Sequence, residues 1–203
     1  LKQAMTAAND NLAKAKAFDQ TISKLASIQI DFSNEESITA LKTQLIAIDK
    51  AYNALTSFQK QLINDNSKKV IEPFQQILSI SGEIGALKPD NKQNYRDAVS
   101  KIGEDIKKLI EKGPININDA ISISGDNIKG IIPNIEKYEK AVGDIQAIQD
   151  IEKQIIEKLI GTKEAPANPT KEQIDEVLDI YNKLPADQKR IVMNSTFFTE
   201  QED

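Results

Sequence analysis

The residues Ser57 and Lys60 have the order and spacing of a catalytic pair. In the Ser-x-x-Lys pattern of penicillin-interacting enzymes, one turn of helix brings a lysine beside a nucleophilic serine. The chain has no Lys-Thr-Gly or Ser-Asp-Asn sequence to complete such a site. We therefore interpret Ser57 as part of the cap of a short helix, with a structural role.

Two further patterns have the spacing of ligand-binding loops. The stretch from Gly125 to Gly130 has the glycine spacing of a phosphate loop, but Ile131 stands where that loop requires lysine. Asn/Asp clusters at 9–11, 64–66 and 116–119 lack the ligand order of a calcium loop. We interpret both patterns as helix boundaries. Asn and Asp accept hydrogen bonds from the free backbone amides at the start of a helix, and Gly commonly ends one.

Acidic pairs with the residue types of glycosidase catalysis are Glu35 with Glu36 and Asp175 with Glu176. Both occur among many Glu and Lys residues at helical spacing, which is typical of a solvated helix face. The chain contains no histidine, which excludes histidine-based triads and imidazole proton shuttles. We therefore predict no catalytic, cofactor-binding or metal-binding residue and no enzymatic activity, and the ligand-binding residues remain unknown.

The composition of the 203-residue chain also restricts its partners. The formal net charge is −5 with no long block of either sign, so nucleic acid is not an expected partner. The absence of cysteine rules out disulfides and suits a protein exported through a Gram-positive envelope. No apolar run approaches the ~20 residues of a membrane span, so we predict no transmembrane segment. The start at Leu1, without a signal-peptide pattern, indicates a piece of a longer protein.

The elements that position these residues are organised around an internal repeat. Residues 38–66 return near the end of the chain, where Tyr181 matches Tyr52 at an offset of 129 and Val192 matches Ile63. Each copy places apolar residues at steps of three and four, and then reaches a corner, at Thr56 or Pro185, before a second short helix. A degenerate middle copy is centred on Ile106. We interpret both tyrosines as residues of the helix seam, with sugar stacking as the alternative.

The helical spacing of apolar residues along the rest of the chain predicts an all-α fold. We expect tandem helical bundles, which are three-helix-like units in an elongated arrangement. Helices are expected at 2–29 with a break near 9–11, from 67 to about 86, where Pro73 either kinks the helix or marks its beginning, and at 90–112. The stretch 115–125 is expected as a short helix, with a short strand as the alternative. The predicted domains are 1–88, then 89–161 with a long helix at about 126–160 that begins at Asp126 or Pro133, and then 162–203, a linker and the start of a third repeat. Gly161 is expected to end the long helix.

The repeated motif resembles the helical repeats of Gram-positive cell-surface and S-layer-type proteins. Tyr52-Asn53-Ala54-Leu55 with Gln59-Lys60, and Tyr181-Asn182-Lys183-Leu184 with Gln188-Lys189, carry this resemblance. It covers two stretches of about 25 residues and one degraded copy. The resemblance implies a secreted or wall-attached protein in which the helices act as spacer, lattice or adhesive modules, and it transfers no catalytic residue.

The sequence therefore favours a non-catalytic structural or spacer module of a bacterial surface protein. Its expected partners are other domains of the same protein, and cell-wall polysaccharide or a host ligand if it is instead an adhesin or a wall-polymer-binding module. A helical pore-forming toxin component is the second alternative, motivated by the long helix and the isoleucine-rich stretch 115–132.

Overall fold

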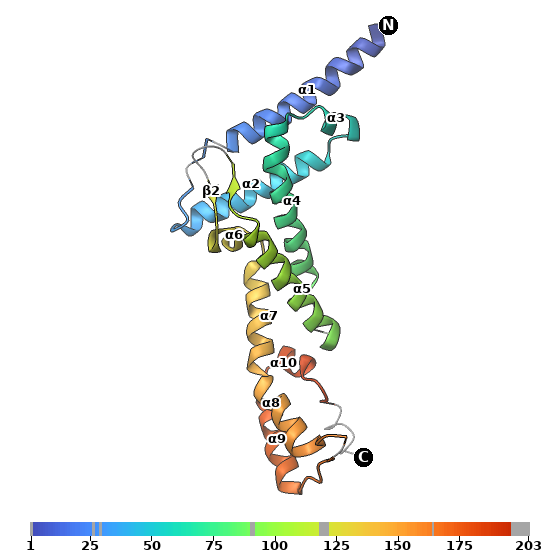
Figure 1. The fold of residues 1–203 in the computed structure, drawn as a ribbon, viewed down its shortest axis with the longest axis vertical. Coiled ribbons are helices and arrows are strands. Elements are labelled where there is room, and N and C mark those ends of the chain that lie inside the picture. The colour runs from blue at the N-terminus through green and yellow to red at the C-terminus, as the bar shows by residue number, and fades with distance from the viewer. Residues whose placement is uncertain are drawn as a thin grey trace. The chain divides into compact units, whose positions relative to one another are not determined.

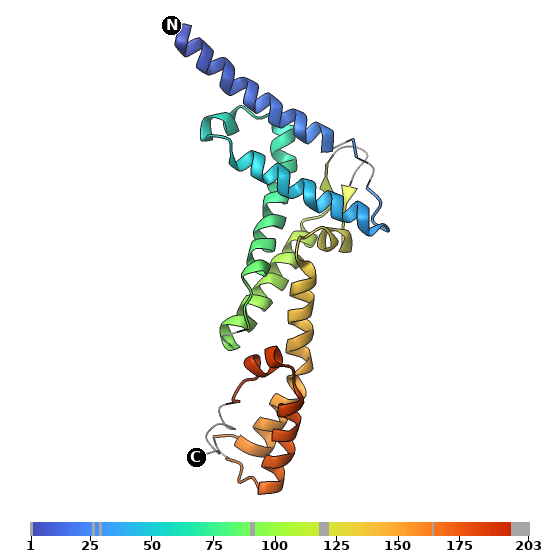
Figure 2. The same ribbon diagram turned by 180° about the vertical axis from the view of Figure 1, so that it is seen from behind.

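The protein is an all-α chain with one small antiparallel hairpin (Figures 1 and 2). The computed structural model describes residues 2–25, 27–28, 30–89, 92–117, 122–163 and 165–195. The first seven elements are α1 (Lys2–Leu25), α2 (Glu35–Asn53), α3 (Ser57–Gln61), α4 (Asp65–Ala86), α5 (Lys92–Glu111), β1 (Ile115–Asn116) and β2 (Ser122–Ile123). They are followed by α6 (Asp126–Gly130), α7 (Ile135–Ala147), α8 (Gln149–Gln154), the π-helix η1 (Ile155–Ile160), α9 (Lys171–Lys183) and α10 (Ala186–Ile191).

The chain divides into two compact units, each built from two separate stretches. Unit 1 comprises residues 1–83 and 103–135, and unit 2 comprises residues 84–102 and 136–203. Helices α4 and α5 each contribute to both units. The predicted domains 1–88, 89–161 and 162–203 are contiguous stretches, and their independence stays a prediction.

Unit 1 begins with α1, which contacts both α2 and α3. Its buried residues Ala15, Phe18, Ile22 and Leu25 recur at steps of three and four, as in an amphipathic helix. The expected break near 9–11 is wrong: α1 runs unbroken through it, because alanines are abundant there and two asparagines cost little helix propensity. The expected end at residue 29 is also too late, since Ser27 and Ile28 form turn hydrogen bonds to Lys24 and Leu25.

Helix boundaries in unit 1 follow the capping residues of the sequence. Asn34 caps α2 by accepting from the backbone N–H groups of Glu36 and Ser37. Asn64 does the same for Ser67 at the start of α4. Pro73 lies inside α4, so the alternative in which it begins that helix is wrong.

The stretch 115–125 was expected to form a short helix, and for its described residues this is wrong. Strand β1 pairs with β2 in antiparallel register, with Ile115 opposite Ile123 and Asn116 opposite Ser122. The isoleucines are buried and their neighbours Asn116 and Ser122 are exposed, which is the period of two that a strand needs. Residues 118–121 lie outside the described part of the chain.

Unit 2 contains α7, α8 and η1, with α9 returning along α8 and η1 (Figure 2). The expected continuous helix over about 126–160 is wrong. Between α6 and α7 the chain turns at Ile131–Asn134, where Pro133 has no N–H to donate and Asn134 adopts a φ of 62°. A second interruption falls at Ile148, and the last turns form the π-helix η1.

Gly161 ends η1 as the sequence predicts. Its φ is +74°, and a Cβ at this position would lie 2.2 Å from the backbone nitrogen of Ala167, so only glycine fits. The following loop is closed by hydrogen bonds from Thr162 N to Ala165 O at 2.9 Å and from Ala167 N to Ile160 O at 2.9 Å. The whole of the predicted linker 162–169 belongs to unit 2.

Candidate functional site

The repeated corner is the feature that the chain builds twice, once in each unit. In unit 1, Thr56 caps α3 through a complete capping box with Gln59. The side chain of Gln59, which is 4% exposed, donates from Nε2 to Asn11 Oδ1 of α1 at 2.8 Å. This bond ties the corner to the first helix of the unit.

Two further contacts complete the first corner. Lys60 Nζ lies 4.5 Å from the centroid of the Tyr52 ring, and that ring packs against Phe18 with centroids 5.6 Å apart. The backbone N–H of Asn64 donates to the Asp19 carboxylate at 3.3 and 3.4 Å. The orphan amide that follows the short helix is therefore satisfied by a side chain of α1.

The last corner repeats three of these contacts in unit 2. Gln188 Nε2 donates to Asp144 Oδ1 at 3.0 Å, and Lys189 Nζ lies 5.8 Å from the Tyr181 ring centroid. The backbone N–H of Met193 donates to Glu152 Oε1 at 2.8 Å. Val192, the counterpart of Ile63, is fully buried.

The repeat therefore extends beyond the matched sequence to a third helix. Asn11 and Asp19 are eight residues apart on α1, and Asp144 and Glu152 have the same spacing on α7 and α8. These positions are related by an offset of 133 rather than 129, since 144 − 11 and 152 − 19 both equal 133. Sequence comparison at a single offset missed these four partners, and the only signal for them was the shared spacing.

Among the residues that the structure describes, the last corner has an ion-pair partner with no counterpart at the first. Arg96 of α5 pairs with Glu152 and also donates from Nη2 to the Ile191 carbonyl at 3.1 Å. The two charged side chains are only 21% and 14% exposed. Glu152 thus accepts from both a guanidinium and a backbone amide, which fixes the end of α10 on α5 and α8.

The electrostatics of the last corner centre on Tyr95, which is 7% exposed. Burial raises the pKa of the Tyr95 hydroxyl, the charges of Asp144 and Asp187 raise this pKa further, and Lys140 opposes them. A hydrogen bond to Asp144 raises the pKa of Lys140. These shifts follow from packing between α5, α7 and α10 and identify no acid or base beside a cavity.

The residues predicted from chemical spacing do not form a catalytic arrangement. Ser57 is exposed in the first turn of α3, while Lys60 engages the Tyr52 ring. Gly125 immediately precedes α6, and Ile131 is fully buried. Among the Asn/Asp clusters, residues 9–11 lie within α1, Asn64 caps α4 and Asn116 belongs to β1.

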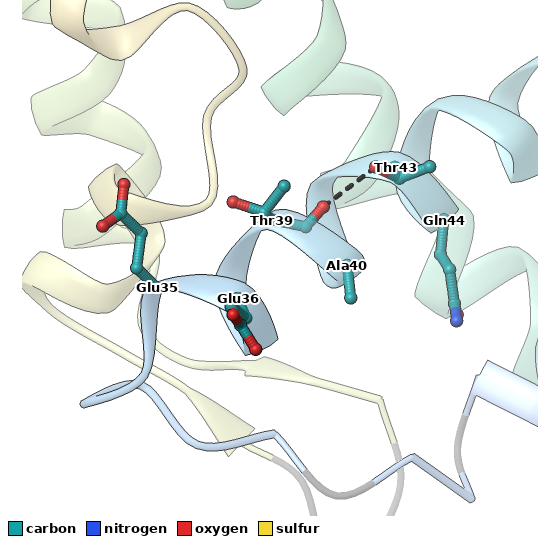
Figure 3. Close-up of a pocket in the computed structure, with 6 residues that line it drawn as sticks. All are labelled: Glu35, Glu36, Thr39, Ala40, Thr43 and Gln44. Atoms are coloured by element: carbon teal, nitrogen blue, oxygen red, sulfur yellow. Dashed lines mark hydrogen bonds between the residues drawn. The ribbon is translucent and has the colours of Figure 1, made fainter.

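The acidic pairs lie on helix surfaces. Glu35 and Glu36 begin α2 and line an open hollow along its exposed face, where their side chains point in different directions (Figure 3). In the other pair, Glu176 binds Lys158 of η1 at 3.1 Å. The hollow is lined by one helix alone, with residues Glu35, Glu36, Thr39, Ala40, Thr43 and Gln44.

Two further hollows lie between α4 and α5 in unit 1 and share the lining residues Gln76, Leu109 and Lys112; we call them together the groove. Their lining includes the apolar Pro73, Ile80 and Leu109 as well as lysines and carboxylates. Lys112 crosses the groove with a 3.0 Å hydrogen bond to Gln76. An exposed aromatic or basic groove would favour glycan or wall-polymer binding, and this groove has neither an aromatic lining nor a single sign of charge among its lining residues.

Within the described ranges, no group of three or more Asp or Glu side chains could hold a metal ion. None of the helices in that part of the chain combines the length and apolarity needed to cross a membrane.

No family model matches the chain, and no curated protein or solved structure is significantly similar to it. The resemblance to Gram-positive surface repeats therefore stays a hypothesis that rests on the repeated motif.

Proposed function

We propose that this chain is a non-catalytic structural module, a helical spacer of a bacterial cell-surface or S-layer-type protein. The observation that carries the proposal is the recurring corner, in which a glutamine side chain and a backbone amide bind equivalent positions of a neighbouring helix in each unit. The recurring side chains bind neighbouring helices of their own unit. A repeat retained for packing is what a spacer needs, whereas a repeat retained for binding would direct its shared residues outward.

The distribution of charge supports the same conclusion. Several ion pairs in the described part of the chain are exposed contacts one helical turn apart, such as Lys107 with Glu111 and Lys153 with Glu157. Such pairs each contribute little and keep a helix soluble. The surface location rests on the resemblance of the Tyr52 and Tyr181 motifs alone.

Small-angle X-ray scattering tests the spacer function directly. An extended particle is expected, because a spacer must hold its ends apart. A compact globule of this mass would overturn the proposal. A pull-down with purified cell-wall polysaccharide would distinguish a spacer from a wall-binding module, since a spacer stays in the supernatant.

A further inference from the structure

In the described part of unit 1, nothing covers the outer face of α2. This face lies opposite the buried Leu41, Leu45 and Ile48, and its residues recur at steps of three and four over four turns. All of them are exposed, and we name them the α2 face: Glu36, Thr39, Ala40, Thr43, Ile46, Ala47 and Lys50. Between its two end charges the face carries no charged side chain, and Ile46 is 49% exposed.

The centre of the α2 face is suited to contact with another helix. Figure 3 shows Thr39, Ala40 and Thr43 beside the open hollow that follows α2. Thr43 Oγ1 donates to the Thr39 carbonyl at 2.9 Å, so covering Thr43 would leave no unsatisfied hydroxyl donor. Side chains this small allow the axis of a second helix to approach to about 8 Å, the lower end of the usual range.

The other two copies of the repeat carry charged residues at the positions of the α2 face. At the offset of 129, positions 43, 46, 47 and 50 correspond to exposed acidic residues of α9, which are Glu172, Asp175, Glu176 and Asp179. At the offset of 54, which is 106 − 52, positions 43, 47 and 50 correspond to the exposed Asp97, Lys101 and Glu104 of α5. Those two faces are ordinary solvated helix surfaces. The first copy alone shows the depletion of charge that marks the centre of a protein interface.

The two charges that bound the α2 face are placed symmetrically about Thr43. Glu36 lies seven residues before it and Lys50 seven residues after it, since 43 − 36 and 50 − 43 both equal 7, so all three share one heptad stripe. Neither charged side chain has an ion-pair partner in the described part of the chain. If two copies of α2 lie antiparallel with Thr43 at the centre, Glu36 of each copy meets Lys50 of the other. A parallel pair would instead bring like charges together.

From these observations we infer that the α2 face binds the same face of a second copy, with the two helices antiparallel about a twofold axis beside Thr43. In that register Ile46 lies opposite Thr39 of the second copy, and Ala47 lies opposite Ala40. A contact between identical faces closes at a dimer. It follows about 21 Å of helix and is smaller than a standard stable interface, so the dimer forms only at high protein concentration. Pairing of this kind is independent of the spacer function, because it would join any two copies side by side.

Sedimentation velocity over a series of protein concentrations tests for the dimer. The wild-type chain is expected to shift from monomer to dimer as its concentration rises, with no larger species. Ile46→Glu/Ala47→Glu places acidic residues where α9 carries Asp175 and Glu176, so this variant should fold and lose the dimer. Phe58→Glu changes a side chain that is 54% exposed outside the α2 face, and it should dimerise like the wild type.

Exchange of the end charges tests the antiparallel orientation. Glu36→Lys and Lys50→Glu should each weaken the dimer, because each variant opposes like charges at both ends of the contact, and added salt should reduce this effect. The double variant Glu36→Lys/Lys50→Glu should recover wild-type dimerisation, since opposite charges meet again. Circular dichroism verifies that each variant is folded.

Disulfide cross-linking tests the register, and the chain has no cysteine of its own to interfere. Thr43→Cys places two thiols beside the twofold axis and should cross-link to a dimer on mild oxidation. Ala40→Cys and Ala47→Cys should cross-link far better when mixed than alone, whereas the exposed control Ser57→Cys should stay monomeric. A wild-type chain that is monomeric at every concentration, undiminished dimerisation of Ile46→Glu/Ala47→Glu, or cross-linking of Ala40→Cys alone as efficient as in the mixture would each overturn the inference.

Discussion

The corner at Thr56 and the corner at Pro185 reach the same geometry with different polar groups. The first uses a capping box and a bond from Gln59 to Asn11, and its carboxylate, Asp19, accepts at 3.3 and 3.4 Å. The last has no side-chain cap at Pro185, and its carboxylate, Glu152, accepts at 2.8 Å and also binds Arg96. The comparison indicates that the repeat preserves the direction of the chain at the corner, while the stabilising contacts are distributed differently.

The largest expected effect comes from removing the ion pair that only the last corner has. Arg96→Met leaves Glu152 without its cation in a site that is mostly shielded from water. We expect the free energy of unfolding of unit 2 to fall by about 2–3 kcal/mol, at the lower end of values for buried pairs because both side chains retain some exposure. Urea unfolding followed by circular dichroism measures this loss.

A matched control for Arg96 is Arg190, whose ion pair with Asp187 spans 3.7 Å with both side chains more than half exposed. Arg190→Met should change stability by less than about 0.5 kcal/mol. Equal losses in the two variants would contradict the special role of the Arg96 contact.

The next largest loss of stability is expected from replacing the corner glutamines, Gln59 and Gln188. Gln59→Ala removes both the capping box and the bond to Asn11, and it should cost about 2 kcal/mol because Gln59 is buried. Gln188→Ala removes one bond to Asp144 from a half-buried side chain, and about 1 kcal/mol is expected.

Hydrogen exchange at Leu62 and at Met193 assigns each loss to its own corner. Gln61→Ala, an exposed change in the same short helix, is the control for Gln59. A larger loss from Gln188→Ala than from Gln59→Ala would reverse the comparison between the corners.

The helices and caps of the first corner were largely predictable from the sequence. The periodic residues Leu41, Leu45 and Ile48 indicate α2. Asn34 caps the start of α2, and Thr56 caps the start of the following helix, α3. These features are local, because each depends on residues within a few positions of one another. Gly161 was predictable for the same reason, since its positive φ follows from the end of a helix.

The contacts between helices could not be predicted in this way. Asn11, Asp19, Asp144 and Glu152 are paired with residues more than 40 positions away, and the changed offset hides their equivalence. The hairpin of β1 and β2 was missed because alternating isoleucines compete with helix-cap signals in the same stretch. The interruption at Ile148 was missed because the isoleucine period continues across that residue, where the backbone turns.

A smaller effect is expected from the lysines above the tyrosine rings. Lys60 lies 4.5 Å from its ring centroid and Lys189 lies 5.8 Å away. A cation over an aromatic face contributes about 0.5–1 kcal/mol at exposed sites and weakens with distance. Lys60→Met should therefore destabilise its corner by about 0.5 kcal/mol, and Lys189→Met should destabilise the last corner less. Thermal unfolding of both variants beside the wild type tests the order, and a larger loss for Lys189→Met would contradict it.

The smallest expected effect on stability occurs only in alkaline solution. It concerns Tyr95, which lies beside the last corner. Burial, with Asp144 and Asp187, raises the pKa of Tyr95 above its ordinary value of 10.0. The folded state therefore holds the phenolic proton more tightly than the unfolded state does. The stability that the protonated Tyr95 hydroxyl contributes is complete below the ordinary pKa and is lost as the pH rises through the raised pKa of the folded state.

Hydrogen exchange near Met193 should accelerate in that range more than exchange near Asn64, and Tyr95→Phe should remove the difference. Parallel loss of protection in the wild type and in Tyr95→Phe would show that another group governs the alkaline response of this corner.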